Sequence, residues 1–346
     1  MLYPSVYASY NYVSAARMLE GDDARAELAI SQIGNYFLYH PYIRRTIPHY
    51  PKANDIISPY DFGGFWFNTN NRDITAKLIS EFGSHFLDYC LSENIVTEFI
   101  RFYPFAHLHE LHLVYHISKV TDNVILFLDK EYGDIWNNYK RSLRKALRKA
   151  KRSDLRALWT TNLKAFIDIY YANLHYHKAQ SQYYFPCGFL EKILDHLIIV
   201  EIRDKEDEIC ATHIYLDDNE ILFAFLCHGR REKQQLRPND FCYDFIIDHF
   251  CSNNKRIMHF GGGSYDLMKY KSKFSNNTIP YYIGRKVYND NLYAELVNRT
   301  MKDMGIDHDC VSFFPKYRFI SQWPARQETH SNGYSSEIAI EQIDLR

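Results

Sequence analysis

The stretch LIIVEIRDKEDEICATHIYLDDNEILFAFLCHG, residues 197–229, predicts three β-strands joined by two short, aspartate-rich turns. The next stretch, RPNDFCYDFIIDHFCSNN at 237–254, predicts a helix with proline in its first turn and asparagines at its end. RIMHFGGG at 256–263 then predicts a strand that runs into a glycine loop. Three strands, a helix and a further strand indicate a mixed sheet flanked by helices, which is an α/β fold.

The first half of the chain has a comparable order of elements. Two β-rich runs, 24–33 and 35–45, predict a hairpin around Gly34–Asn35. Residues 73–94 have apolar positions at helical spacing. Residues 96–105, 111–121 and 123–129 predict strands, and 131–152 predict a further amphipathic helix. A chain of 346 residues is long for one core, so we expect two domains.

Composition excludes several classes of protein. The net charge is −1, so anion binding must be local. The first residues lack the pattern of a signal peptide, and the apolar runs are too short to cross a bilayer. We therefore expect a cytoplasmic protein without a transmembrane segment. Seven cysteines without a C-x-x-C pair argue against a disulfide framework and a zinc ribbon.

Positive charge is concentrated in one predicted amphipathic helix, residues 140–156. It carries nine Lys and Arg among seventeen residues. Such a helix can bind tRNA or a phosphorylated lipid head group, and the plain alternative is a solvated face. This helix keeps open a function without catalysis, as a nucleic-acid or tRNA-binding module.

A metal site is a further alternative, because FAHLHELHLVYH at 105–116 holds four histidines. They are His107, His109, His112 and His116. HELH is one residue short of the H-E-x-x-H motif, so it cannot place two histidines one helical turn apart. We therefore expect no metal site.

Seven short motifs occur in an order that resembles the Fem-type acyltransferases. They are SPYDFGG (58–64), FIRFYPF (99–105), RKALRKA (144–150), YYF (183–185), RPN (237–239), HFGGG (259–263) and YKSKF (270–274). HPYIRR at 40–45 and FFPKYR at 313–318 also look like that family's early strand and closing segment. The resemblance covers about residues 2–322, and the ordered set is its specific feature.

The resemblance implies two tandem GNAT-like domains with a cleft between them. They would comprise residues 1–122 and 123–284. A closing segment, 285–325, would pack back on the first domain, and 326–346 would be a polar, mobile tail.

The resemblance also implies a reaction centre at Lys271, in the pattern Tyr-Lys-x-x-Phe. An ammonium there can hold an acceptor phosphate or stabilise the oxyanion that forms when an amine attacks a carbonyl. Asp61, in SPYDFGG, would orient the acceptor or take its proton. The alternative for Asp61 is a turn aspartate that bonds its own backbone.

Residues that would bind the two substrates follow from the same motifs. For the acceptor they are Arg44, Arg45, Arg101, Tyr184 and Tyr270. Arginine binds phosphate bidentately, although Glu98 is an equally good internal partner for Arg101. For the donor they are Gly261, Gly262, Gly263, Arg237, Asn239, Arg144 and Arg148.

The implied reaction moves an acyl or aminoacyl group to an amine of a cell-envelope precursor, a sugar, a nucleotide-sugar or a lipid-linked acceptor. Acyl-CoA or aminoacyl-tRNA would be the co-substrate, with no tightly bound cofactor, and membrane-surface contact is compatible with this. Direct transfer is favoured, because no cysteine or serine has a plausible activating histidine.

The sequence also departs from the family's pattern. HGRREKQQLRPND at 228–240 replaces the glycine-rich string that holds the CoA pyrophosphate, which weakens the acyl-CoA prediction. Tyr176 stands where relatives often carry an arginine. A degenerate scaffold, in which Lys271→Ala changes at most stability, is the remaining alternative.

Overall fold

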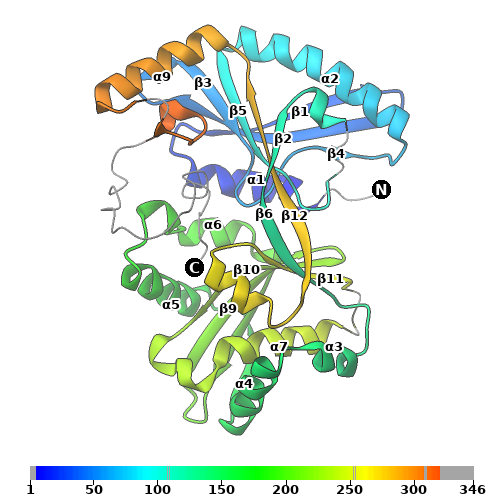
Figure 1. Ribbon diagram of the computed structural model, residues 1–346, viewed down its shortest axis with the longest axis vertical. Helices are drawn as coiled ribbons and strands as arrows, with labels where there is room; N and C mark the ends of the chain where they lie inside the picture. The colour runs from blue at the N-terminus through cyan, green and yellow to red at the C-terminus, as the bar shows by residue number, and fades with distance from the viewer. Residues whose placement is uncertain are drawn as a thin grey trace. The chain divides into compact units, whose positions relative to one another are not determined.

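The chain forms two compact units (Figure 1). The computed structural model describes residues 5–106, 108, 110–251, 253, 255–307 and 310–319. Unit 1 contains the residues up to Val120 and those from Tyr281 onward, and unit 2 is Thr121–Pro280. The predicted tail, 326–346, lies outside the described residues. Each unit combines a mixed sheet with helices, which confirms the predicted mixed α/β class.

Unit 1 is built on a sheet in the order β1-β2-β3-β5-β12. Its strands are β1 (Arg25–Ile33), β2 (Tyr36–Ile47), β3 (Tyr50–Ile57), β5 (Ile95–Arg101) and β12 (Asn277–Val287), and the short β4 (Trp66–Phe67) pairs with β2. Neighbouring strands are antiparallel except β3 and β5, which are parallel. The predicted hairpin is confirmed: Ile33 pairs with Tyr36, and Gly34 takes the positive φ of 59° that the turn requires.

Helices cover both faces of the unit 1 sheet. Unit 1 contains α1 (Tyr10–Ala16), α2 (Arg72–Ser92) and α9 (Asp290–Met304). The Asn71 side chain caps α2 by accepting from the backbone of Asp73 and Ile74. Consecutive β5 residues point to opposite faces: Ile95 joins the α2 cluster and Val96 the α9 cluster.

Unit 2 is built on a sheet in the order β6-β11-β10-β9-β8-β7. Its strands are β6 (His116–Phe127), β7 (Arg156–Thr160), β8 (Leu197–Arg203), β9 (Ile209–Asp218), β10 (Ile221–Gly229) and β11 (Ile257–Gly261). The predicted three-strand meander is confirmed as β8, β9 and β10. Strands β10 and β11 are parallel, and the predicted helix α7 (Pro238–Phe250) connects them.

The two units share one topology. Each has an antiparallel meander, then a helix, then a strand parallel to the last meander strand. A further antiparallel strand lies beside the parallel strand of each unit. The strand after β5, which is β6, pairs with β11, and the strand after β11, which is β12, pairs with β5.

The unit 2 core lies mainly under two helices. Unit 2 contains α3 (Tyr132–Asn138), α4 (Arg141–Arg152), α5 (Leu163–Tyr176), α6 (Cys187–Lys192), α7 and α8 (Tyr265–Lys271). Leu143 and Leu147 of α4 pack with Ile246 and Ile247 of α7 in one buried cluster. Phe166 of α5 instead packs on His228 of β10.

The basic helix predicted at 140–156 is wrong in its extent. Helix α4 ends at Arg152, and Asp154 takes a positive φ of 51° that breaks the helix. Arg156 begins β7, where its guanidinium pairs with Asp207 at 2.9 Å. Strand pairing between β7 and β8 therefore takes the residues that a longer helix would use.

Two further boundaries differ from the prediction. Residues 131–152 form two helices because the backbone is extended at Tyr139 and Lys140. The separate strands predicted at 111–121 and 123–129 are one strand, β6, preceded by a 3₁₀ turn at Leu111–Leu113. No proline or glycine marks these points in the sequence.

Candidate functional site

A glycine turn follows β11 and leads into α8. Gly261 and Gly263 have φ values of 75° and 128°, which side chains other than glycine's rarely allow. Ser264 caps α8 by accepting from the Leu267 backbone. The helix then carries Lys271 at its last turn, with only 7% of the residue exposed.

The Lys271 ammonium lies against this glycine turn. Its Nζ donates to the Gly262 carbonyl oxygen. The position of a β-carbon at Gly261 lies 3.5 Å from Nζ, which is an ordinary contact distance, so glycine is favoured there by its positive φ and not by a lack of space. The turn and the lysine therefore form one local structure.

Two residues that the sequence analysis did not identify complete this structure. A β-carbon at Gly262 would be 2.7 Å from Asn123 Oδ1. The Asn123 amide donates to His259 Nε2 at 3.2 Å. Burial and the nearby Lys271 ammonium lower the pKa of His259 to about 3, so its imidazole is neutral. We call Lys271, the glycine turn, Asn123 and His259 the lysine cluster.

Sequence reasoning could not find Asn123, because its partner is 136 residues away. Asn123 lies on β6, which pairs with β11. His259 lies in the HFGGG motif, but only the pairing of these two strands brings it to Asn123.

The first turn of α7 lies in the same unit and contains two more predicted donor residues. Arg237 has a left-handed φ of 67° and precedes Pro238, the first residue of the helix. Asn239 Oδ1 accepts from His213 Nε2 at 3.1 Å. A β-carbon at Gly229 would be 2.6 Å from that oxygen, so a glycine is needed there.

Tyr270 points into the interior of unit 2. Burial and the neighbouring Asp240 carboxyl raise the pKa of its hydroxyl. Burial also raises the pKa of Asp240, in the first turn of α7. Burial between α7 and α8 therefore favours the protonated, neutral form of both the Tyr270 hydroxyl and the Asp240 carboxyl.

The predicted donor residues on α4 differ from one another. Arg144 Nη1 donates to the carbonyls of Asn137 and Tyr139, at 2.7 and 2.9 Å, and so holds the end of α3. Arg148 is exposed. Tyr184, predicted for the acceptor, packs its ring on Tyr171 at 5.3 Å.

In unit 1, Asp61 lies in a loop that the N-terminal segment fixes. Asp61 has a positive φ of 65°, and its Oδ2 accepts from the Tyr7 hydroxyl at 2.8 Å. The Tyr12 hydroxyl donates to the Tyr60 carbonyl at 2.9 Å. Burial and the Asp61 carboxylate raise the pKa of Tyr12, whereas the Arg101 charge lowers it. Asp61 and Arg101 therefore act on the same tyrosine.

The predicted arginines of unit 1 make internal contacts. Arg44 pairs with Glu93 at 2.9 Å. Arg45 is buried and pairs with Glu20 and Asp55, at 2.6 and 2.9 Å. These contacts hold both guanidinium groups within the unit, and acceptor binding by them stays a prediction.

Glu98 is not the partner of Arg101. Glu98 accepts from His40 at 2.7 Å and from the hydroxyls of Tyr115 and Tyr288. The Arg101 guanidinium instead lies 5.2 Å from the centre of the Phe99 ring.

Nothing in the described part of the chain resembles a metal centre or a membrane span. Among those residues, no cluster of three or more His, Cys, Asp or Glu could hold a metal ion. His107 and His109 of the FAHLHELHLVYH segment lie outside the described residues. No helix among the described residues has the length and apolarity to cross a bilayer.

Comparison with known proteins identifies the fold. No family model and no curated protein matches the sequence. The crystal structure of FemX matches with a TM-score of 0.67 at 10% identity, covering 83% of this chain and 93% of FemX. The chain has the fold of FemX.

Two other structures share this Fem-type fold. One is the C-terminal domain of a putative lysylphosphatidylglycerol synthetase from Agrobacterium fabrum, with a TM-score of 0.53 at 12% identity. It covers 86% of this chain and 92% of that domain. The other is a conserved protein of unknown function from Bacteroides thetaiotaomicron, with a TM-score of 0.50 at 10% identity and coverages of 80% and 90%.

Proposed function

We propose that this chain is a Fem-like acyltransferase that transfers an acyl or aminoacyl group to an amine of a cell-envelope precursor or a nucleotide-sugar. The fold shared with FemX supports acyl transfer. The name of a second relative, a putative lysylphosphatidylglycerol synthetase, supports an aminoacyl group. The observation that carries the proposal is the buried Lys271 ammonium against the glycine turn.

The lysine cluster suits the stabilisation of an oxyanion. A buried ammonium interacts with developing negative charge more strongly than one in water does. The neighbouring His259 is neutral, so it does not add a second positive charge beside Lys271.

The proposed reaction is a direct transfer. The neutral acceptor amine attacks the donor's ester or thioester carbonyl, and a C–N bond forms while Lys271 stabilises the oxyanion. The intermediate then expels the tRNA ribose hydroxyl or the CoA thiol, which takes up the proton that the amine loses. No acyl group is bound to the enzyme at any step.

We assign the remaining predicted residues by their contacts. Asp61 and Arg101 are proposed for the acceptor, because Arg44 and Arg45 already make ion pairs inside unit 1. For the donor we propose the glycine turn, Arg237 and Arg148. Both arginines are exposed, and exposed guanidinium groups suit the phosphates of tRNA or CoA.

A donor and acceptor panel tests the proposal. Purified protein is incubated with labelled aminoacyl-tRNAs or acyl-CoAs and with nucleotide-sugar or lipid-linked amines, and the acylated acceptor is measured. We expect product with one donor class. Lys271→Ala should lower kcat/KM by about 10²–10³-fold, the usual effect of removing one oxyanion donor.

The matched control is Lys269→Ala, because Lys269 is exposed on the same helix. It should leave kcat/KM within about twofold, as expected for an exposed side chain with no part in the reaction. Full activity of the Lys271→Ala variant would contradict the role proposed for Lys271, whereas no product with any donor would leave the degenerate-scaffold alternative standing.

A further inference from the structure

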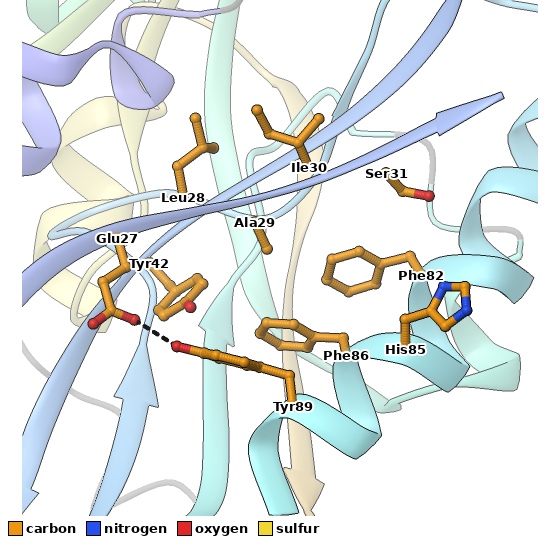
Figure 2. A pocket seen from close by; sticks show the side chains of 10 residues that line it. All are labelled: Glu27, Leu28, Ala29, Ile30, Ser31, Tyr42, Phe82, His85, Phe86 and Tyr89. Carbon is orange, nitrogen blue, oxygen red and sulfur yellow. Dashed lines mark hydrogen bonds between the residues drawn. The ribbon is translucent and has the colours of Figure 1, made fainter. Parts of the chain in front are cut away.

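Unit 1 contains a hollow of about 500 Å³ that the proposed reaction does not use (Figure 2). Strand β1 supplies one wall through five consecutive residues, and α2 supplies the other. The lining residues are Glu27, Leu28, Ala29, Ile30, Ser31, Tyr42, Phe82, His85, Phe86 and Tyr89.

The hollow exists because the sheet ends beneath α2. β1 is the edge strand, and β2 is its neighbour in the sheet order of the described residues. Ala29 and Ser31 alternate with the exposed Leu28 and Ile30, so they point to the α2 face of the sheet. Their small side chains leave space below the helix.

The helix side of the hollow is aromatic. Phe82 stacks on Phe86 with ring centres 4.6 Å apart, and Phe86 stacks on Tyr89 at 5.8 Å. Tyr42 meets Phe86 edge-on at 5.6 Å. Figure 2 shows Tyr42, Phe86 and Tyr89 grouped beside the Glu27 carboxylate.

Glu27 gives the hollow its charge. It is the one carboxylate in the lining, and the lining contains no lysine or arginine. The Tyr89 hydroxyl donates to Glu27 at 3.3 Å, and Arg44 Nη1 is 4.0 Å away. Because Arg44 is much closer to Glu93, at 2.9 Å, the Glu27 carboxylate still attracts a further cation.

We propose that this hollow binds a free small-molecule organic cation with an apolar body, such as a quaternary ammonium compound. Aromatic ring faces attract organic cations, and a carboxylate at the same place adds to that attraction. An anion would be repelled by the Glu27 carboxylate. An uncharged apolar molecule would fill the space but gain nothing from the carboxylate.

The test compares choline with its uncharged isostere, 3,3-dimethylbutan-1-ol, by ligand-observed NMR titration of the full chain. We expect choline to bind about tenfold more tightly, the effect of a cation–π contact worth about 1.4 kcal/mol. Glu27→Gln should reduce the difference, because it keeps the shape and the aromatic rings of the hollow but removes the negative charge. Equal binding of the two compounds, or no saturable binding of choline, would overturn the proposal.

Glu81→Gln is the matched control. It removes a carboxylate that is exposed on α2 and is not one of the lining residues. We expect it to keep the preference for choline, and a loss as large as that of Glu27→Gln would overturn the assignment to the hollow. Sedimentation with phosphatidylcholine vesicles forms the second arm: capture by vesicles without binding of free choline would overturn a free small-molecule ligand.

Discussion

At the scale of residues, the lysine cluster combines residues that the sequence motifs predicted with a residue that they did not predict. The motifs identified Lys271 and the three glycines, because glycine and lysine at this spacing are visible in the sequence. They did not identify Asn123, whose amide meets His259 only because β6 pairs with β11. Contacts of this kind depend on which strands pair with each other, and the local patterns of a single sequence do not show that.

Gly262→Ala tests how tightly the cluster is packed. The added β-carbon would lie 2.7 Å from Asn123 Oδ1, so the amide that donates to His259 must move. We expect a loss of about 1–3 kcal/mol in unfolding free energy, the usual cost of overpacking. Gly133→Ala is the control, since nothing lies within 4 Å of its β-carbon, and it should not destabilise. Urea denaturation measures both, and equal effects would contradict the packing described.

Glu98→Gln tests a buried hydrogen-bond network in unit 1. The Glu98 carboxylate lies 2.7 Å from His40 Nε2 and accepts from the hydroxyls of Tyr115 and Tyr288. Glutamine replaces one accepting oxygen by a donor and removes the charge from these hydrogen bonds, so we expect a loss of about 1.5–3 kcal/mol. Chemical denaturation would measure it, and a loss below about 1 kcal/mol, the range of exposed pairs, would contradict it.

At the scale of elements, regular patterns were predictable and interruptions were not. The hairpin, the meander and α7 follow from alternation, turn residues and capping residues. The break at Tyr139 and Lys140 has no such marker, and helical spacing continues across it in the sequence. Tertiary pairing of β7 with β8 decides where α4 stops.

Exposed cations on α4 give a prediction at this scale. Lys145 and Arg148 are exposed on the side opposite the buried Leu143 and Leu147. We expect the chain to bind tRNA with a salt-dependent affinity, and Lys145→Gln with Arg148→Gln to reduce the slope of log K against log salt by about 2, one for each phosphate contact.

Filter binding over a range of salt concentrations measures that slope. Lys205→Gln is the control, because Lys205 is an exposed lysine in another part of unit 2 that pairs with Glu206. An unchanged slope in the α4 double variant would mean that this face of the helix is only solvated.

At the scale of the whole molecule, buried histidines make stability depend on pH. Burial lowers the pKa of His213 to about 4 and those of His228 and His259 to about 3. In the unfolded chain they titrate near 6.5, so the unfolded state binds more protons as the pH falls from 7 to 5. Between pH 7 and pH 5, each of these histidines therefore lowers the unfolding free energy by about 2 kcal/mol. Burial raises the pKa of Asp244 to about 6, so its carboxyl binds a proton at a higher pH in the folded state than in the unfolded state. This proton uptake offsets about 1 kcal/mol of the loss.

Urea unfolding at pH 7 and pH 5 would measure a net loss of about 4–5 kcal/mol. His259→Gln should reduce that pH dependence by about 2 kcal/mol, because it removes one of the three titrating groups. Equal unfolding free energies at the two pH values would contradict neutral, buried histidines.

The division into units also predicts which fragments fold. Residues 121–280 are contiguous and contain the whole unit 2 core, whereas residues 5–120 lack β12 and α9. Without α9, Ile47, Ala53 and Val96 lose the partners that bury them, among them Leu296 and Met301. We therefore expect 121–280 to unfold cooperatively on its own and 5–120 to remain unfolded.

Rejoining the two parts of unit 1 is the decisive comparison. A fragment of 5–120 linked through a flexible glycine-serine segment to 281–319 restores β12 beside β5 and α9 over Val96. Burial of that apolar face should restore a cooperative thermal transition by circular dichroism. If 5–120 folds equally well alone, the pairing of β12 with β5 and the packing of α9 add nothing to the stability of unit 1.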